Sequence, residues 1–135
     1  METSLGPEHP KVASALNNLA ELLRATNRLA EAEPLYRRAL AIDELSFGPD
    51  HPNVARDLNN LAVRLKATGR HAEAEPLYRR AVQILFLFTR RTGHEHPHLQ
   101  TVVNNYAGLL QEMGLSKDEV VERLQSLVQE VLGEG

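Results

Sequence analysis

Apolar positions along the chain recur with the three- and four-residue spacing of one face of an α-helix. One such stripe is formed by Leu16, Leu19, Ala20 and Leu23. A second follows within the next twenty residues, formed by Ala32, Leu35, Tyr36 and Ala39. Between the stripes lie residues that favour turns, so the pattern predicts paired amphipathic helices and no β-strand.

The helix pair is repeated along the chain. The segment Gly-Pro-Glu-His-Pro at residues 6–10 recurs 42 residues later as Gly-Pro-Asp-His-Pro at 48–52. It recurs a third time, after 45 residues, as Gly-His-Glu-His-Pro at 93–97. In the first two copies, residues 6–47 and 48–89, 27 of the 42 aligned positions are identical. A period of this length indicates an array of stacked supersecondary units.

The residues between the stripes predict where helices begin and end. Prolines suit the first helical turn, where no backbone bond is lost, and these are Pro10, Pro52 and Pro97. Glycines suit the left-handed position after a helix, and these are Gly48 and Gly93. The turn inside each pair is expected at Asn27, Gly69 and Gly114, because these residues tolerate positive φ most readily. Pro34 and Pro76 fall about one turn into the second helices, where each removes one backbone bond.

The second helix carries a small-aromatic-small series that resembles the tetratricopeptide repeat. The series is formed by Ala32, Tyr36 and Ala39, and again by Ala74, Tyr78 and Ala81. The pairs Leu19-Ala20 and Leu61-Ala62 match the large-small pair of the first helix in that family. The 42-residue length and the Gly-Pro-Asp-His-Pro link are similar to the longer repeats of kinesin light chains and their bacterial relatives. This series disfavours HEAT and armadillo repeats, whose periods also lie in the forties.

The resemblance covers residues 6–114 and implies an all-α, right-handed α-solenoid of three helix–turn–helix repeats. We expect a single domain over residues 1–135. Residues 1–8 would be the remnant and link of a preceding repeat, and the repeats would span 9–50, 51–95 and 96–135. The last helix of the third repeat replaces small residues with Val120, Leu124, Leu127, Val128 and Val131, as expected of a C-terminal capping helix. Ser116 and Glu119 form a capping box at its start.

The apolar run at residues 84–88 has no counterpart in the first repeat, where Asp43, Glu44 and Ser46 stand in place of Leu85, Phe86 and Phe88. The longer spacing of 45 residues also begins there. We therefore expect an extended second helix that packs on the helices of the third repeat.

Composition and charge exclude several classes of function. The net charge of −3 and the pI of about 6.1 give no global attraction to nucleic acid or anionic membranes, so we expect neither as a partner. The basic pairs Arg37-Arg38 and Arg79-Arg80 follow glutamates on the same helices, which favours intrahelical ion pairs over nucleic-acid binding. No apolar run approaches the roughly 20 residues that span a bilayer.

We expect neither an enzyme nor a metal or other cofactor site. The chain has no cysteine, which excludes thiolate chemistry and suits a reducing cytoplasm. No nucleophile elbow, phosphate-binding loop or His-Glu-x-x-His stretch is present. His94, His96 and His98 lie close together, but His96 is the third copy of His9 and His51, so we interpret these residues as loop and helix-start groups.

Asparagine doublets at one repeat position are the most informative polar feature. They are Asn17-Asn18, Asn59-Asn60 and Asn104-Asn105. Asparagine is a mediocre mid-helix residue, but its amide can pair with the backbone of an extended peptide. With the core stripe centred near Leu19 and Leu23, the first member of each doublet lies on the flank of the helix, and we favour peptide binding there. For the second member we favour a structural role between repeats.

The resemblance implies that this flank lines the concave surface of the array. Following it by helical spacing predicts a groove lined by Asn17, Glu21, Arg24, Arg56, Asn59, Val63, Lys66, Asn104, Gly108 and Gln111. The predicted function is a protein–protein interaction scaffold, located in the cytoplasm, that holds an extended peptide of a partner protein. The alternative is a structural or oligomerisation arm of a larger protein without a peptide ligand. Self-association through the N-terminal face is a further expectation, because a preceding repeat would normally cover that face.

Overall fold

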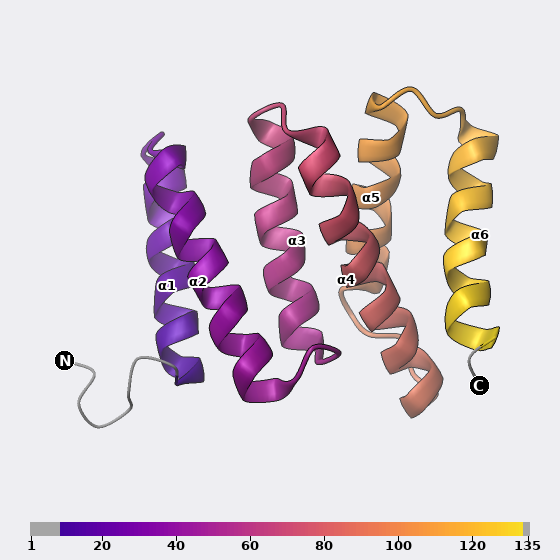
Figure 1. Cartoon of the computed structure of the whole chain (residues 1–135), viewed down its shortest axis with the longest axis horizontal. Coiled ribbons are helices and arrows are strands. Elements are labelled where there is room, and N and C mark those ends of the chain that lie inside the picture. The colour runs from indigo at the N-terminus through magenta and orange to yellow at the C-terminus, as the bar shows by residue number, and fades with distance from the viewer. Residues whose placement is uncertain (1–8, 134–135) are drawn as a thin grey trace.

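Six α-helices and no strand make up residues 9–133, the part of the chain that the computed structural model describes. They are α1 (Pro10–Ala25), α2 (Leu29–Phe47), α3 (Pro52–Ala67), α4 (His71–Thr92), α5 (Leu99–Glu112) and α6 (Lys117–Gly133). Successive helices run in opposite directions and stand side by side in chain order, as Figure 1 shows. The helix pairs therefore stack into an α-solenoid, which confirms the fold class expected from the repeat.

The repeated histidine makes the same backbone hydrogen bond ahead of each first helix. His9 Nδ1 accepts a hydrogen bond from the Lys11 amide at 3.0 Å, and His51 Nδ1 accepts one from Asn53 at 3.0 Å. His96 Nδ1 accepts the equivalent bond from His98 at 3.1 Å. These bonds satisfy backbone donors that a helix start leaves without a partner. A helix-start role is therefore confirmed for His9 and His51, whereas the bond to His96 lies in the turn that precedes α5.

Two of the three predicted proline starts are found. α1 and α3 begin at Pro10 and Pro52, but α5 begins at Leu99, two residues after Pro97. The prediction for Pro97 was wrong because the chain makes an additional turn there, closed by a hydrogen bond of 3.0 Å from the Leu99 amide to the His96 carbonyl.

The turns inside the repeats lie where the sequence predicts them. Asn27, Gly69 and Gly114 have φ values of 66°, 81° and 101°, a region that glycine and asparagine enter most readily. Gly93 ends α4 in the left-handed conformation. Gly48 also has positive φ, but its ψ of 163° is extended, so the chain leaves α2 in a different direction. Pro34 and Pro76 lie inside α2 and α4, as expected.

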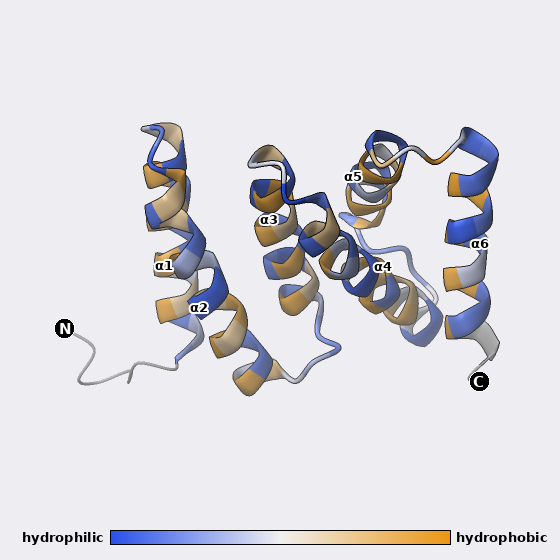
Figure 2. Ribbon diagram, turned by 45° about the horizontal axis from the view of Figure 1, so that its top comes forward, coloured by the Kyte–Doolittle hydropathy of each residue, from blue (hydrophilic) through white to orange (hydrophobic). Residues whose placement is uncertain are grey.

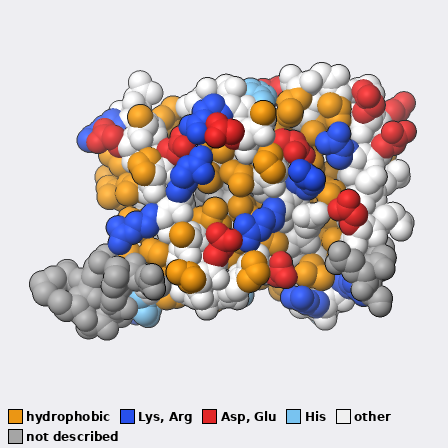
Figure 3. Space-filling model, viewed as in Figure 1, with side chains coloured by type: hydrophobic (Ala, Val, Ile, Leu, Met, Phe, Trp, Pro, Cys, Tyr) orange, Lys and Arg blue, Asp and Glu red, His pale blue; other side chains and the backbone are white. Residues whose placement is uncertain are grey.

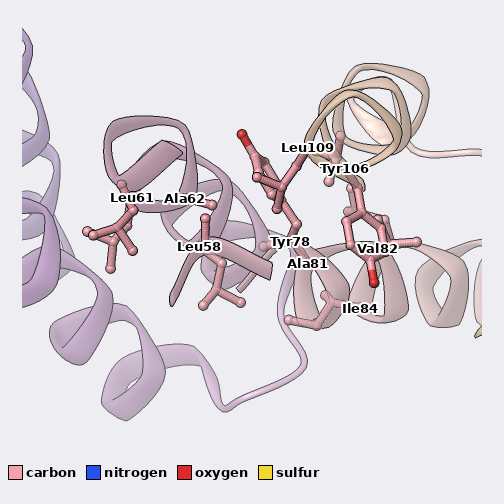
Figure 4. Packing of buried hydrophobic residues seen from close by; sticks show 14 of the residues in the cluster. Leu58, Leu61, Ala62, Tyr78, Ala81, Val82, Ile84, Tyr106 and Leu109 are labelled. Atoms are coloured by element: carbon pink, nitrogen blue, oxygen red, sulfur yellow. The ribbon is translucent and has the colours of Figure 1, made fainter. Parts of the chain in front are cut away.

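One core cluster runs from the first hairpin to the last helix, and a smaller, separate cluster lies within the first hairpin. In Figure 4, Leu58 and Ala62 of α3 lie beside Tyr78 and Ala81 of α4, with Tyr106 of α5 beyond them. The alanines of the small-aromatic-small series are fully buried, so the helix backbones approach closely, as the repeat pattern predicts.

The third helix pair is more open than the first two. α1 packs closely on α2 and α3 on α4, whereas α6 contacts α4 more extensively than it contacts α5. Its bulky residues Val120, Leu127 and Val131 are buried, and Figure 2 shows its hydrophobic residues facing the rest of the array. Large side chains in place of alanines hold the backbone of α6 away from α5. The capping box at its start is formed: Glu119 accepts from the Ser116 amide at 2.8 Å, and the Ser116 hydroxyl accepts from the Glu119 amide at 3.2 Å.

The extended helix α4 reaches the last helix, which confirms the expectation for residues 84–88. α4 has 22 residues against 19 in α2. Leu85 is buried and Phe86 packs against the core. Arg90 donates to the carbonyl of Val131 at 2.6 Å, and Gln83 donates to Glu130 at 3.0 Å. The apolar run is thus covered where α4, α5 and α6 meet.

At the opposite end of the array, the apolar face of α1 is open among the described residues. Leu19 is 46% exposed, whereas its repeat counterpart Leu61 is 1% exposed because α3 lies between two repeats. The buried stripe of α1 consequently runs through Ala13, Leu16, Asn17 and Ala20 and is not centred near Leu19. The expected remnant at residues 1–8 lies outside the described residues.

Candidate functional site

The polar side chains of the asparagine doublets lie along the first helices of the repeats. In Figure 1, α2 and α4 stand nearer the viewer, so α1 and α5 lie on the far side of the array. Two hollows follow this side, one between α1 and α3 and one between α3 and α5. We call them the first groove and the second groove.

The first groove has a volume of about 400 Å³ and is strongly polar. Its lining residues are Ser14, Asn17, Asn18, Glu21, Arg56, Asn60, Val63 and Arg64. Amide groups come from both walls, and the two arginines face one glutamate. The groove therefore offers hydrogen-bond donors and acceptors side by side, which is what an extended peptide backbone requires.

The second groove has a volume of about 250 Å³ and combines a polar rim with apolar residues. Its lining residues are Pro52, Arg56, Asn59, Asn60, Leu85, His96, His98, Thr101 and Val102. Arg56 and Asn60 line both grooves, so α3 is the wall that the grooves share.

A buried polar cluster lies against the first groove, where α1, α2 and α3 meet. Asn17 Nδ2 donates to Asp57 Oδ1 at 3.0 Å. Arg56 donates to Asp43 Oδ2 and to Asp57 Oδ1, each at 3.3 Å. Asp43 and Asp57 are almost completely buried, and Arg56 reaches them from the groove. One arginine thus faces two buried carboxyl groups.

Two acceptor atoms of this cluster have no hydrogen-bond partner among the described residues. They are Asn17 Oδ1 and Asp57 Oδ2. Burial and, after it, the neighbouring Asp43 raise the pKa of Asp57 to about 7, against the opposing effects of Asn17 and Arg56. The raised pKa favours the protonated form of Asp57, which removes one negative charge from the buried cluster.

Four of the predicted site residues meet at the first groove, namely Asn17, Glu21, Arg56 and Val63. Glu21 accepts hydrogen bonds from the Tyr36 hydroxyl and from Arg24, the latter at 3.1 Å. Burial acts to raise the pKa of Glu21, but the hydrogen bonds from Tyr36 and Arg24 outweigh it and lower the pKa. Glu21 and Arg24 are therefore held as a pair at the edge of the groove.

The first asparagines of the doublets have different surroundings, and Asn17 is the most buried of them. Asn17 is 9% exposed, because the face of α1 that packs on the next repeat includes it. Asn59 lines the second groove and accepts a hydrogen bond of 3.1 Å from Asn105, so this doublet joins adjacent repeats. Asn104 is exposed and accepts a bond of 3.0 Å from Gln100 on its own helix.

The remaining predicted residues lie farther along the array. Lys66 crosses from α3 to α5, where it pairs with Glu112 at 2.8 Å, and a Cβ added at Gly108 would lie 3.7 Å from its Nζ. His71 also contacts Glu112, at 3.0 Å, and this bond raises the pKa of His71. Gln111 is exposed on α5 and lines neither groove.

Sequence reasoning missed several lining residues. Ser14, Asn18, Asn60 and Arg64 face the first groove, although the second asparagines were assigned to structure. The burial of Asp43 and Asp57 was not predicted either. The replacement of Asp43 by Leu85 was interpreted only as a sign of an extended helix, and Asp57 could have been noticed as a break in the repeat, because Ala15 and Val102 replace it in the two other copies.

The face of the array that Figure 3 shows carries no large patch of positive or negative charge alone. Figure 3 shows Lys and Arg side chains scattered among acidic and hydrophobic ones. Arg37 pairs with Glu33 at 3.0 Å and Arg79 with Glu75 at 3.3 Å, which confirms intrahelical pairing for these two arginines. Arg80 instead joins two repeats by pairing with Glu44 at 2.8 Å.

Two further features are absent from the part of the chain that the structure describes. Within residues 9–133, no helix is long and apolar enough to cross a membrane. Across the same residues, no three His, Cys, Asp or Glu side chains converge as a metal ligand set.

Comparison with known proteins agrees with this architecture. The tetratricopeptide repeat family model matches residues 1–45 and 11–85. Paired helices of the small-aromatic-small type, stacked into a right-handed α-solenoid, define this class of repeat scaffold. The chain belongs to the tetratricopeptide repeat family. No curated protein sequence matches it.

Solved structures with the same fold come from Podosopora anserina. One is a kinesin light chain-like protein with nearly identical TPR-like repeats, with a TM-score of 0.68 and 24% identity. The match covers 98% of the present chain and 60% of that chain. A variant of the same protein gives a TM-score of 0.69 and 24% identity over 96% of the present chain and 60% of that chain. The present chain thus spans about 60% of the length of these structures, and the likeness shows the fold.

Proposed function

We propose that the array is a protein-interaction scaffold that binds an extended peptide segment of a partner protein across the first and second grooves. Tetratricopeptide repeats generally mediate protein–protein interactions, and this class supports the broad role. The observation that carries the finer proposal is the first groove. There the exposed amide of Asn18 and the amide of Asn60 line the hollow beside Arg56 and Arg64.

The predicted site residues take defined parts in this proposal. Asn17, Asn59 and Asn104 follow the path of the peptide, with Glu21, Arg24, Arg56 and Lys66 as charged groups beside it. Val63 and Gly108 leave room for ligand side chains, and Gln111 lies farther along the same flank. A peptide held in this way pairs its backbone with amides and places its side chains in the two hollows.

A displayed random-peptide library selected on the full chain tests the proposal. Peptides that bind the grooves should lose at least tenfold in affinity to the double variant Asn60→Ala/Arg64→Ala, since the variant removes one amide and one guanidinium from the first groove. The matched control is Gln125→Ala/Gln129→Ala, which removes two exposed amides from α6 and should leave the affinity unchanged. Binders that respond equally to both variants, or a selection without binders, would contradict the proposal.

The second candidate function is that of a structural or oligomerisation arm. The exposed outer face of α1 favours it. Leu19 and Leu22 of α1 are 46% and 61% exposed. The equivalent face of α3 is covered by the preceding repeat. A scaffold that associates through the outer face of α1 should show a larger sedimentation coefficient as concentration rises. The variant Leu19→Glu/Leu22→Glu should abolish that rise, whereas concentration-independent sedimentation of the wild type would exclude this candidate.

We further propose that the chain acts in the cytoplasm without catalytic activity, cofactor or nucleic-acid partner. The scaffold class and the absence of cysteine from the sequence support this assignment.

A further inference from the structure

The outer face of α1 lies at the end of the array, and its counterparts on α3 and α5 are covered (Figure 1). α3 packs on α2 of the preceding repeat, and α5 packs on α4. Leu61 of α3 and Tyr106 of α5 are therefore buried, whereas Leu19 at the same repeat position of α1 is half exposed. The two covered faces show which kind of helix each set of residues accepts.

The face of α3 carries charged residues, namely Arg56, Asp57 and Arg64, and α2 presents the acid Asp43 to it. Arg56 donates to Asp43 Oδ2 and to Asp57 Oδ1, each at 3.3 Å, and Asn17 also donates to Asp57. A buried carboxylate without a partner is strongly unfavourable. α3 therefore accepts the acid of α2 because it supplies an arginine beside it.

The face of α5 is largely apolar at the same three positions, which carry Thr101, Val102 and Leu109. Val102 and Leu109 are buried, and α4 presents Leu85 where α2 has Asp43. Leu85 and Val102 belong to one buried cluster. An apolar residue on one helix is thus matched by an apolar residue on the other.

The outer face of α1 resembles that of α5 and not that of α3. Its three positions carry Ser14, Ala15 and Leu22, a hydroxyl residue and two apolar residues in the same order as on α5. All three are exposed. A helix like α2 docked here would bury Asp43 against Ala15, and no arginine would stand at position 14 to pair with the carboxylate.

Resting on the second candidate function, in which α1 packs against another polypeptide, we propose that this face docks a tetratricopeptide helix pair whose second helix resembles α4. The docked helix carries an apolar residue at the place of Asp43 and covers Ala15, Leu19 and Leu22, which continues the type of interface between α4 and α5. A helix like α2 is rejected, because its acid would be buried without a partner. Matched residues on the two sides of each junction thus determine which helix pairs stack on one another.

An array extended by one helix pair tests this matching. A copy of residues 6–47, joined directly before Gly6 in place of residues 1–5, recreates the natural link between repeats and places its second helix against α1. The change Asp43→Leu in the copy alone gives this helix the residue that α4 carries. The changed chain should melt at least about 5 °C higher than the chain whose copy retains Asp43, because its junction buries no unpaired carboxylate. The matched control, Glu31→Leu in the copy alone, replaces an exposed acid of the same helix and should give no such gain.

Exchanging the face of α1 separates matching from a general gain of apolar surface. The changes Ser14→Arg and Ala15→Asp in the helix that meets the copy give it the pair found on α3. The order should then reverse, so that the extended chain whose copy retains Asp43 melts at the higher temperature. Both positions are exposed in the unextended chain, and the same two changes there should leave its melting temperature nearly unchanged, which verifies that the variant folds.

Three outcomes would overturn the proposal. They are a copy with Asp43→Leu that is the more stable on both faces, equal melting temperatures for the two copies, and a copy that melts separately from the array in every variant. Sedimentation of the wild-type chain judges the second candidate function independently. A rise of the sedimentation coefficient with concentration, found without the reversal of melting temperatures, would overturn the matching and leave that function intact.

Discussion

Asp57 shows how a single residue changes the chemistry of one junction between repeats. It stands where the other copies have Ala15 and Val102, and it is 1% exposed beside Asp43. Two buried carboxylates facing one arginine are unfavourable, because removal from water penalises each charge and like charges repel. The cluster is therefore most stable when the two acids hold one proton.

The stability of the chain should consequently depend on pH through Asp57. Its pKa in the folded chain is raised to about 7 from an ordinary value of 3.8, so the folded state binds the proton more tightly than the unfolded state. The resulting stabilisation is complete below about pH 4 and is lost as the pH rises toward 7. Urea denaturation at pH 5, 6, 7 and 8 should give a decreasing free energy of unfolding.

The variant Asp57→Asn should flatten this decrease, since an amide keeps the shape but binds no proton in this range. The control Asp50→Asn changes an exposed carboxylate in the loop before α3 and should leave the slope as in the wild type. Equal slopes for the wild type and Asp57→Asn would show that Asp57 is not the group responsible.

Asn17 and Asn18 form a second test at the residue scale, because neighbouring asparagines have different surroundings. Asn17 is buried and donates to Asp57, so Asn17→Ala should lower the free energy of unfolding by about 1–3 kcal/mol. Asn18 is exposed, and Asn18→Ala should change it by no more than about 0.5 kcal/mol. Urea denaturation at one pH measures both, and equal losses would contradict the assigned roles.

The asparagines also show how far the sequence could predict the candidate site. Repetition identified the correct helices and the face that carries the doublets. It could not tell which amides are buried, because the burial of Asn17 depends on Asp57 in the next copy, a residue outside the repeat pattern. The true buried stripe of α1 passes through Asn17, which the apolar spacing of Leu19 and Leu23 conceals.

Among the helices, α4 and α6 depart most from the repeat, and they do so together. α4 is three residues longer than α2 and carries the apolar run at residues 84–88. α6 presents Leu127 and Val131 to the array and receives Arg90 at the Val131 carbonyl. The two helices that depart from the repeat pattern thus pack against each other at the C-terminal end of the array.

Deleting residues 115–135 should therefore cause aggregation or a large loss of thermal stability, because Leu85, Phe86 and their neighbours would lose their cover. Light scattering and circular dichroism during heating would measure both. The control Val121→Ala changes an apolar residue of α6 that is 50% exposed and should leave the melting temperature nearly unchanged. A truncated chain that remains soluble and monomeric with its melting temperature intact would reassign the run to partner binding.

The elements themselves were largely predictable. Helix pairs, internal turns and the capping box follow from local chemistry that acts within a few residues, and each is found at its predicted place. The start of α5 and the openness of the third pair were not predicted. Both depend on how α4, α5 and α6 pack, which no single segment encodes.

At the scale of the whole molecule, contacts among the described residues join only successive helix pairs. Within residues 9–133, no packing connects α1 or α2 with α5 or α6. Stability in such an array is approximately the sum of each unit and its interfaces with its neighbours. The contribution of a residue to the free energy of unfolding then depends on whether its repeat packs against one neighbouring repeat or two.

Leu19 and Leu61 test this dependence, because they are the same residue at the same repeat position. Leu61→Ala should lower the free energy of unfolding by about 2–5 kcal/mol, as for other fully buried leucines. Leu19→Ala should cost about 1 kcal/mol or less, since Leu19 is half exposed at the end of the array. Urea denaturation of the two variants measures these losses, and a low protein concentration keeps self-association from covering Leu19. Similar losses would mean that the face of α1 is covered.

This purely sequential packing has a mechanical consequence. A pulling force applied to the two ends meets no direct link between the outer helix pairs among the described residues, so it is transmitted through each interface in turn. The chain should lengthen in separate steps, with α1 and α2 or α5 and α6 detaching before α3 and α4, which are held on both sides. A peptide lying across both grooves would bridge those interfaces and act as a tether, raising the force at which the first step occurs.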